Sequence, residues 1–176
     1  MCPNHLNSIN PSLEIRCADE EDAEQISALY KRVWDEFKSD FPEKLLQSRQ
    51  PSKMEMIQWI QQDTYLVVVF RNSIIGVVGC KLEHGACLLT HMAVDKNHRR
   101  MGVGTALVEK VIEYAKENDS FKVWLDTAPF MSDAISLYER FGFKKSGYLQ
   151  RHFWGLDVAL YELVLKPQDH GDNDSM

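Results

Sequence analysis

The 176 residues are 44% hydrophobic and 26% charged, a composition that excludes a mainly disordered chain and suits one globular domain. The longest apolar runs, Tyr65–Phe70 and Ile74–Cys80, are far shorter than the roughly 18–20 residues that a membrane-spanning helix needs. The net charge of −6 at pH 7 argues against a nucleic-acid-binding protein, whose binding surface would be basic.

The predicted elements begin with a strand at Leu13–Cys17. Asp19 is a predicted N-cap, and the apolar residues that follow have helical spacing as far as Phe37. The next stretch is polar, and its Pro42 and Pro51 bracket a short segment, Glu43–Leu46, before a second helix that Pro51-Ser52 opens. Helices are therefore expected between the first strand and the rest of the sheet.

Three strands then follow one another as a meander, because runs rich in β-branched residues are separated by short turn signals. The predicted turns are Asn72-Ser73 and Glu83-His84-Gly85. The predicted strands are Thr64–Arg71, Ile74–Lys81 and Ala86–Val94.

In the second half, helices and strands alternate. A basic loop with two glycines leads into a long amphipathic helix that includes Ala106 to Ala115. The elements predicted after it are a strand at Phe121–Leu125, a helix at Ser132–Arg140 and closing strands at Lys144–Arg151 and Asp157–Leu165. Because a helix connects Leu88–Val94 to Phe121–Leu125, these two strands should run parallel.

This order predicts an α/β (α+β) fold with a central, mixed, mostly antiparallel twisted sheet of about seven strands and helices on both faces. Residues 13–166 should form the domain, and residues 1–12 and 167–176 should be flexible ends. The N-terminus lacks the basic and apolar regions of a secretory signal, so we expect a soluble, cytoplasmic protein. Cys80 and Cys87 flank a predicted turn, and whether they ever pair stays open.

The segment from Met92 to Leu107 has the pattern of an anion site: a strand, a basic loop, Gly-x-Gly and a helix. The first N–H groups of a helix have no intrahelical partner, and the helix dipole favours negative charge beside them. Gly102 and Gly104 let a phosphate approach the backbone, and Lys96, Arg99 and Arg100 add positive charge.

Two common nucleotide motifs do not fit this segment. A P-loop needs G-x-x-x-x-G-K-[ST], which does not occur here. A dinucleotide-binding turn needs a third glycine where this chain has Leu107. The phosphate ligand must therefore belong to another class, unless the two glycines merely shape a turn.

The pattern Arg99-x-x-Gly102-x-Gly104 resembles the acetyl-CoA pyrophosphate loop, [QR]-x-x-G-x-[GA], of the GNAT N-acetyltransferase superfamily. Four further groups of residues resemble a second block of that family: Leu125-Asp126-Thr127, Ala134, Leu137-Tyr138-Glu139 and Phe141-Gly142-Phe143. Together the blocks cover about residues 86–147, and the predicted elements fit the family fold across residues 13–165. The chain departs from many members at Met131, where they have an Asn that bonds the cofactor arm.

The resemblance implies that an acetyl group passes directly from acetyl-CoA to a primary amine of a small molecule, peptide or protein. In the family, the pantetheine arm lies along the strand that corresponds to Leu89–Val94, and a backbone N–H near Met92–Val94 faces the thioester oxygen. Tyr138 matches the general acid that protonates the departing thiolate. The implied cofactor-binding residues are Met92, Ala93, Val94, Arg99, Arg100, Met101, Gly102, Val103, Gly104, Thr105, Ala134 and Tyr138.

The reaction also needs a base that takes a proton from the attacking ammonium, and here the sequence leaves several candidates. His91 lies in the right strand, but strand alternation puts it on the same face as Ala93 and opposite Thr90 and Met92, unless a bulge intervenes. Glu83 is the second candidate. His84 and Asp126 could act through water.

The acceptor is expected between the segment 37–51 and the last hairpin, 147–158, whose aromatic residues are Tyr148, His152, Phe153 and Trp154. Residues 14–43 carry ten acids and four bases, which indicates either a solvated helix face or an acidic rim that attracts a cation. A cationic amine is therefore the expected acceptor.

Two other functions compete with the enzyme. One is a non-catalytic acyl-CoA-binding sensor or scaffold, which would not need Tyr138. The other is an interaction protein with an incidental Gly-x-Gly turn. For all three we expect no metal, no nucleic acid and no membrane partner, and a monomer or homodimer.

Overall fold

The computed structural model describes residues 13–165, which form a seven-stranded sheet in the order β1-β2-β3-β4-β5-β7-β6. The strands are β1 (Leu13–Cys17), β2 (Thr64–Phe70), β3 (Ser73–Glu83), β4 (Ala86–Val94), β5 (Lys122–Thr127), β6 (Lys144–Phe153) and β7 (Leu156–Val164). The helices are α1 (Ala23–Asp35), α2 (Glu43–Ser48), α3 (Lys53–Gln62), α4 (Val103–Glu117) and α5 (Ser132–Arg140). Short 3₁₀ turns occur at Glu20–Asp22 and Lys96–His98. The predicted ends, 1–12 and 167–176, lie outside the described residues.

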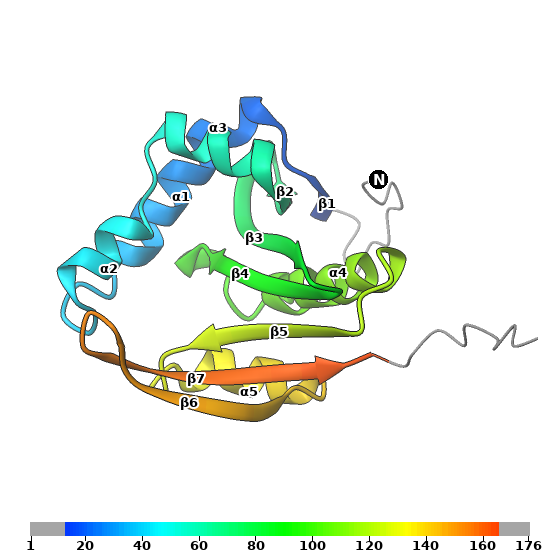
Figure 1. Cartoon of the computed structure of the whole chain (residues 1–176). Coiled ribbons are helices and arrows are strands. Elements are labelled where there is room, and N and C mark those ends of the chain that lie inside the picture. Colours follow the sequence, from blue (N-terminus) through cyan, green and yellow to red (C-terminus); the bar gives the residue numbers. More distant parts are fainter. Residues whose placement is uncertain (1–12, 166–176) are drawn as a thin grey trace, which may run out of the picture.

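The sheet is covered on both faces, as the sequence predicts. Helices α4 and α5 pack on one face, and α1 and α3 pack on the other (Figure 1). The residues of β2 alternate between the two cores, since Leu66 and Val68 contact the α4 side while Tyr65 and Val67 contact the α1 side. A strand buried on both faces has no polar face, which explains the continuous apolar sequence of β2.

Helix α2 lies apart from these layers. It packs with the β6–β7 hairpin around a third, smaller cluster that contains Phe41, Leu45, Leu46 and Ala128 (Figure 1). This cluster brings the segment after α1 to the far end of the sheet. Three segments that are distant in sequence therefore meet where β4 and β5 end: the segment after α1, the loop after β5 and the β6–β7 hairpin.

One of the two predicted hairpin turns, the turn between β2 and β3, lies one residue earlier than predicted. The β2–β3 turn is Arg71-Asn72 rather than Asn72-Ser73, because Phe70 pairs with Ser73 and both turn residues have positive φ values of 49° and 64°. This backbone twist is the one that suits a two-residue hairpin. The β3–β4 turn, His84-Gly85, lies within the predicted segment.

Strands β4 and β5 are parallel, as predicted, but they pair over only a short length. The register runs from Ala86 opposite Lys122 to Leu88 opposite Trp124. Beyond Leu88 the strands separate, and within residues 13–165 no strand pairs with that side of β4. The remainder of β4 therefore borders a gap in the sheet, where its edge has no strand partner.

None of the helices in residues 13–165 has the length and apolar character needed to cross a bilayer.

Candidate active site

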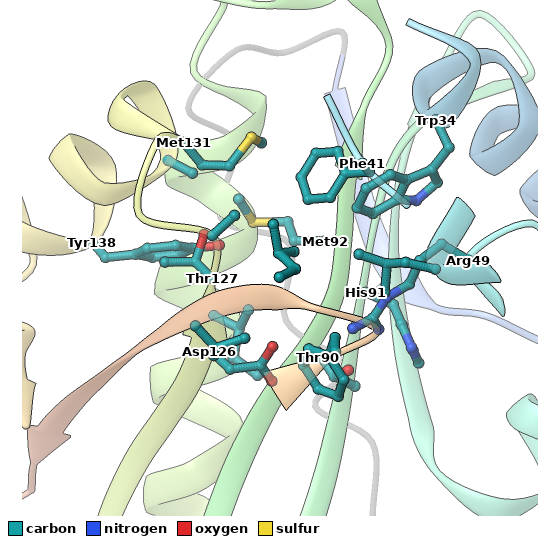
Figure 2. A pocket seen from close by; sticks show the side chains of 17 residues that line it. Trp34, Phe41, Arg49, Thr90, His91, Met92, Asp126, Thr127, Met131 and Tyr138 are labelled. Atoms are coloured by element: carbon teal, nitrogen blue, oxygen red, sulfur yellow. The ribbon is translucent and has the colours of Figure 1, made fainter. Parts of the chain in front are cut away.

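A pocket of about 130 Å³ opens at the place where β4 and β5 separate (Figure 2). Its lining residues come from α1, α2, β4, β5, α5 and the β6–β7 hairpin. They are Trp34, Phe41, Leu45, Arg49, Leu89, Thr90, His91, Met92, Asp126, Thr127, Ala128, Met131, Ala134, Tyr138, Phe153, Leu156 and Val158. The pocket thus lies between the segment 37–51 and the last hairpin, as the sequence predicts for the acceptor.

A β-bulge in β4 shapes one wall of this pocket. The pairing with β3 shifts between Val77, opposite Ala93, and Gly79, opposite Thr90, so His91 and Met92 together face Val78. His91 has a φ of 51°, in the left-handed region. The bulge interrupts strict alternation, and Thr90, His91 and Met92 all line the pocket.

Tyr138 lies on the opposite wall. Helix α5 carries Ala134 and Tyr138 one turn apart, and both line the pocket. The Tyr138 ring packs on Phe143 with the ring centres 5.8 Å apart, and its hydroxyl points toward Met92 and Thr127 (Figure 2). Burial raises the pKa of Tyr138, and the nearby Asp126 carboxylate raises it further. The phenol therefore stays protonated at neutral pH.

The loop before α4 presents backbone donors rather than a dense cluster of free charges. Gly102 is the N-cap of α4 with a φ of 83°, and the first turn continues through Val103, Gly104 and Thr105. A Cβ at Gly102 would meet no atom within 4 Å, so the space beside the N-terminus of α4 is open. Arg100 and Met101 are exposed beside it. The helix N-terminus is thus free to receive an anion.

Arg99, which the resemblance places at the cofactor, makes contacts within the protein. Its guanidinium forms two hydrogen bonds with the Glu36 carboxylate, at 2.9 and 3.0 Å, and a third with the carbonyl oxygen of Val94 at 3.3 Å. Asp95, in the same loop, forms an ion pair with Arg32 and a hydrogen bond with His98. These contacts fix the loop to the end of α1, so the positive charge of Arg99 is already paired.

Close packing places the N-terminus of α4. A Cβ on Gly104 would lie 3.2 Å from Leu137 of α5, and a Cβ on Gly76 would lie 2.6 Å from Val103. The side chain of Val103 is 1% exposed and that of Ala93 is 3% exposed, each within a core. Val103 and Ala93 can therefore offer only backbone groups to a ligand.

The family model of the acetyltransferase (GNAT) family matches residues 27–143, two thirds of the chain. The chain belongs to this family. It is 33% identical over 103 residues to human N-acetyltransferase 8, an alignment that covers 55% of this chain and 45% of the relative. The chain therefore spans about half the length of the curated relatives it matches.

Solved GNAT structures share the fold. An N-acetyltransferase from Staphylococcus aureus Mu50 superimposes with a TM-score of 0.75 at 24% identity, covering 88% of this chain and 99% of the other. A putative acetyltransferase from Salmonella typhimurium, solved with acetyl-CoA, gives a TM-score of 0.74 at 17% identity and covers 94% and 99%. At these identities the likeness establishes the fold.

Of the two candidate bases in this GNAT chain, His91 lies at the pocket but in an unfavourable environment. Its ring stacks on Trp59 at 4.6 Å, and its Nδ1 shares a 3.1 Å hydrogen bond with the hydroxyl of Tyr65. Tyr30 donates a 2.7 Å hydrogen bond to the His91 carbonyl oxygen. Burial, with a smaller contribution from Arg49, lowers the pKa of His91 to about 3. His91 is thus a neutral, weakly basic group.

Glu83 does not join the site. It ends β3, pairs with Ala86 at the first residue of β4, and forms a 2.9 Å ion pair with Lys81. The pocket begins at Leu89, toward the other end of β4. Of the carboxylates in the described chain, the pocket lining includes that of Asp126 on β5.

Of the two alternatives for the acidic segment 14–43, the pocket lining does not contain the acidic rim. From residues 14–43 only Trp34 and Phe41 contribute to the lining, and both are aromatic. Several acids of this segment form ion pairs instead, including Asp22 with Arg16 and Asp35 with Lys31 and Lys38. Among the expected hairpin aromatics, Phe153 lines the pocket, whereas the Tyr148 hydroxyl bonds Asp157.

Sequence reasoning missed Arg49 altogether. It follows α2 and is held at the junction with α3 by backbone hydrogen bonds to the last turn of α2. The segment around it is polar and lacks a motif, so no local signal separates Arg49 from the exposed lysines nearby. Only the packing of α2 toward the hairpin brings it to the pocket.

Proposed function

We propose that this chain transfers the acetyl group of acetyl-CoA to a primary amine bound in the pocket. The observation that carries the proposal is the gap between β4 and β5, which joins an open helix N-terminus to a pocket with Tyr138 on its wall. A long anionic cofactor with a reactive tip needs this combination of a phosphate cradle, a free strand edge and an enclosed end.

The cofactor would lie along β4. Its pyrophosphate would accept hydrogen bonds from the backbone of residues 102–105, and Arg100 would add charge. Its pantetheine amides would pair with the free edge of β4 beyond Leu88, as a peptide adds to a sheet edge. The Salmonella acetyltransferase, which has the same fold, was solved with acetyl-CoA, and this supports acetyl-CoA as the cofactor.

In the reaction, the neutral amine nitrogen attacks the thioester carbonyl carbon. The oxygen becomes negative and would face a backbone N–H of Met92–Val94. As the C–N bond forms and the C–S bond breaks, the sulfur leaves as a thiolate and takes the hydroxyl proton of Tyr138. The proton that the acylated nitrogen still carries passes to the tyrosinate, directly or through water, which leaves a neutral amide and restores the phenol. A free thiol is a stronger acid than a phenol, with a pKa of about 8.5 against about 10, and burial raises the pKa of Tyr138 further. The transfer is therefore completed because the tyrosinate takes up the much more acidic proton of the acylated nitrogen.

We assign the deprotonation of the ammonium to Asp126, directly or through water. Its carboxylate lines the pocket from β5 and carries the negative charge that attracts an ammonium, whereas His91 is neutral with its Nδ1 hydrogen-bonded to Tyr65, and Glu83 lies away from the pocket. Asp126→Asn should lower kcat/KM by about 100-fold or more, the usual contribution of a general base. Glu83→Gln is the matched control, because it also removes one carboxylate charge.

The experiment that tests the function measures free CoA thiol released from acetyl-CoA with a panel of amines. The panel contains polyamines, aminoglycosides, arylalkylamines, amino acids and short peptides. Release that depends on one class of amine supports the enzyme. Thermal stabilisation by acetyl-CoA without release from any amine would instead favour the acyl-CoA sensor, since binding alone at 100 times Kd adds about 2.7 kcal/mol.

A further inference from the structure

The two charged groups that line the pocket have opposite signs. Figure 2 shows the Arg49 guanidinium and the Asp126 carboxylate pointing into the pocket from opposite sides. Within residues 13–165, neither forms an ion pair or a side-chain hydrogen bond. The pocket therefore holds one positive and one negative charge that are complementary to a ligand rather than to each other.

We propose that the acceptor is an amine that carries a carboxylate, namely a free amino acid with an apolar side chain, and that Arg49 binds this carboxylate. The proposal rests on the function proposed above and adds the substrate class. A guanidinium is the side chain best suited to a carboxylate, since its planar fork can donate two parallel hydrogen bonds. Asp126, on the other side, would face the ammonium end.

A second observation is a hydrogen-bond donor without a partner on the same wall. The indole N–H of Trp34 is buried and has no hydrogen-bond partner within the described residues. Its ring lies beside Phe41, near Arg49 (Figure 2). A buried donor without an acceptor is costly, and a carboxylate oxygen drawn to this wall by Arg49 could satisfy it after a small shift of the ring.

The rest of the lining explains the apolar side chain. Phe41, Leu45, Phe153 and Leu156 surround the Arg49 side of the pocket with aromatic and aliphatic groups. These groups give no hydrogen bonds to a polyamine or an aminoglycoside, whose many ammonium or hydroxyl groups would lose their hydration there. A bulky polycation would also face the positive charge of Arg49.

The test compares two substrates in two proteins. kcat/KM for phenylalanine and for phenethylamine, which lacks only the carboxylate, is measured with the wild type and with Arg49→Met. The loss on mutation should be about 10- to 100-fold greater for phenylalanine, as expected for a charge-assisted hydrogen bond. The loss should appear mainly in KM, because the carboxylate is bound equally before and during the reaction. Comparing losses cancels any general damage to the fold and any difference in amine reactivity.

The control is Arg140→Met, which removes the same charge from the exposed end of α5. It should give equal losses for both substrates. Equal losses with Arg49→Met, while both amines still release CoA, would overturn the carboxylate proposal and leave the acetyltransferase intact.

A binding experiment separates this result from a failure of the proposed function. N-acetylphenylalanine and N-acetylphenethylamine are titrated into the CoA-saturated protein by calorimetry, which requires no turnover. Tighter binding of the carboxylate compound, lost in Arg49→Met, supports the inference even if no amine releases CoA. Equal affinities of the two compounds in the wild type would overturn it.

Discussion

The proposed cofactor side and the proposed acceptor side of this site are built in different ways. The loop at the N-terminus of α4 is one continuous segment, and it offers backbone N–H groups held by Gly102 and by the Arg99–Glu36 contact. The acceptor pocket takes side chains from six separate elements, and its two charges come from positions 49 and 126. A shared cofactor can be bound by backbone geometry, whereas the choice of acceptor depends on side chains that can change one by one.

Replacing Tyr138 with Phe should give the largest effect, because it removes the proposed general acid at the junction of the two sides. We expect turnover to fall about 100- to 10,000-fold, the range of general acid–base catalysis, while the Kd for acetyl-CoA stays within about twofold. Initial rates of CoA release and calorimetric binding provide the two measurements. Tyr148→Phe, which removes a hydroxyl bonded to Asp157 on the exposed hairpin, is the control. Full turnover in Tyr138→Phe would mean that the thiolate leaves without this acid.

A glutamate at Gly102 should separate cofactor binding from stability. Its carboxylate would repel the pyrophosphate, and we expect the Kd for acetyl-CoA to rise about 10- to 100-fold, equivalent to about 1.4–2.8 kcal/mol. Gly102→Ala has the same positive φ without the charge, so it reports the backbone strain of about 1 kcal/mol alone.

Gly155→Glu is a matched control for this experiment, because Gly155 also has a φ of 89° and open space around it, at the tip of the hairpin. It should lower stability as Gly102→Glu does and leave acetyl-CoA binding unchanged. Equal affinities in all three variants would move the phosphate site away from this loop.

The stability of the protein should depend on pH through His91. Burial lowers its pKa to about 3 from an ordinary value of 6.5, so between these values the unfolded chain binds a proton that the folded chain does not. The free energy of unfolding should therefore decrease as the pH is lowered through this window, by up to about 1.4 kcal/mol per pH unit. Denaturation by urea at pH 7 and pH 5 measures the change.

His91→Phe keeps a ring that can stack on Trp59 and removes the titrating group, so its stability should change less between these two pH values. His152→Phe on the exposed hairpin controls for the loss of an imidazole elsewhere. A wild type that loses no more stability than His91→Phe would show that His91 is not held neutral by burial.

Glu83→Gln should have the smallest effect. Its side chain pairs with Lys81 near the β3–β4 turn, where exposed ion pairs contribute at most about 1 kcal/mol. We expect kcat/KM for the preferred amine to change by less than about twofold. A loss comparable to that of Asp126→Asn would return Glu83 to the list of candidate bases and would require the cofactor or acceptor to reach the start of β4.

The element order, the parallel β4–β5 pair and the glycine loop could all be predicted, because each follows from local signals. Gly102 must adopt a φ that other residues disfavour, and the residues after it have the apolar spacing of a helix. The face of Tyr138 was also predictable, since Ala134 lies one helical turn before it. Single-residue details, such as the turn at Arg71-Asn72, depended on the register of the strands.

The sequence by itself therefore determined the fold class and the position of the glycine loop before α4, since both depend on backbone preferences of neighbouring residues. The tertiary structure decided the chemistry of the acceptor pocket. The bulge at His91–Met92 altered which side chains of β4 reach the pocket, and burial made His91 neutral. Packing of α2 against the last hairpin brought Arg49 to face Asp126 across the pocket. The two positions are 77 residues apart, and no local pattern links them.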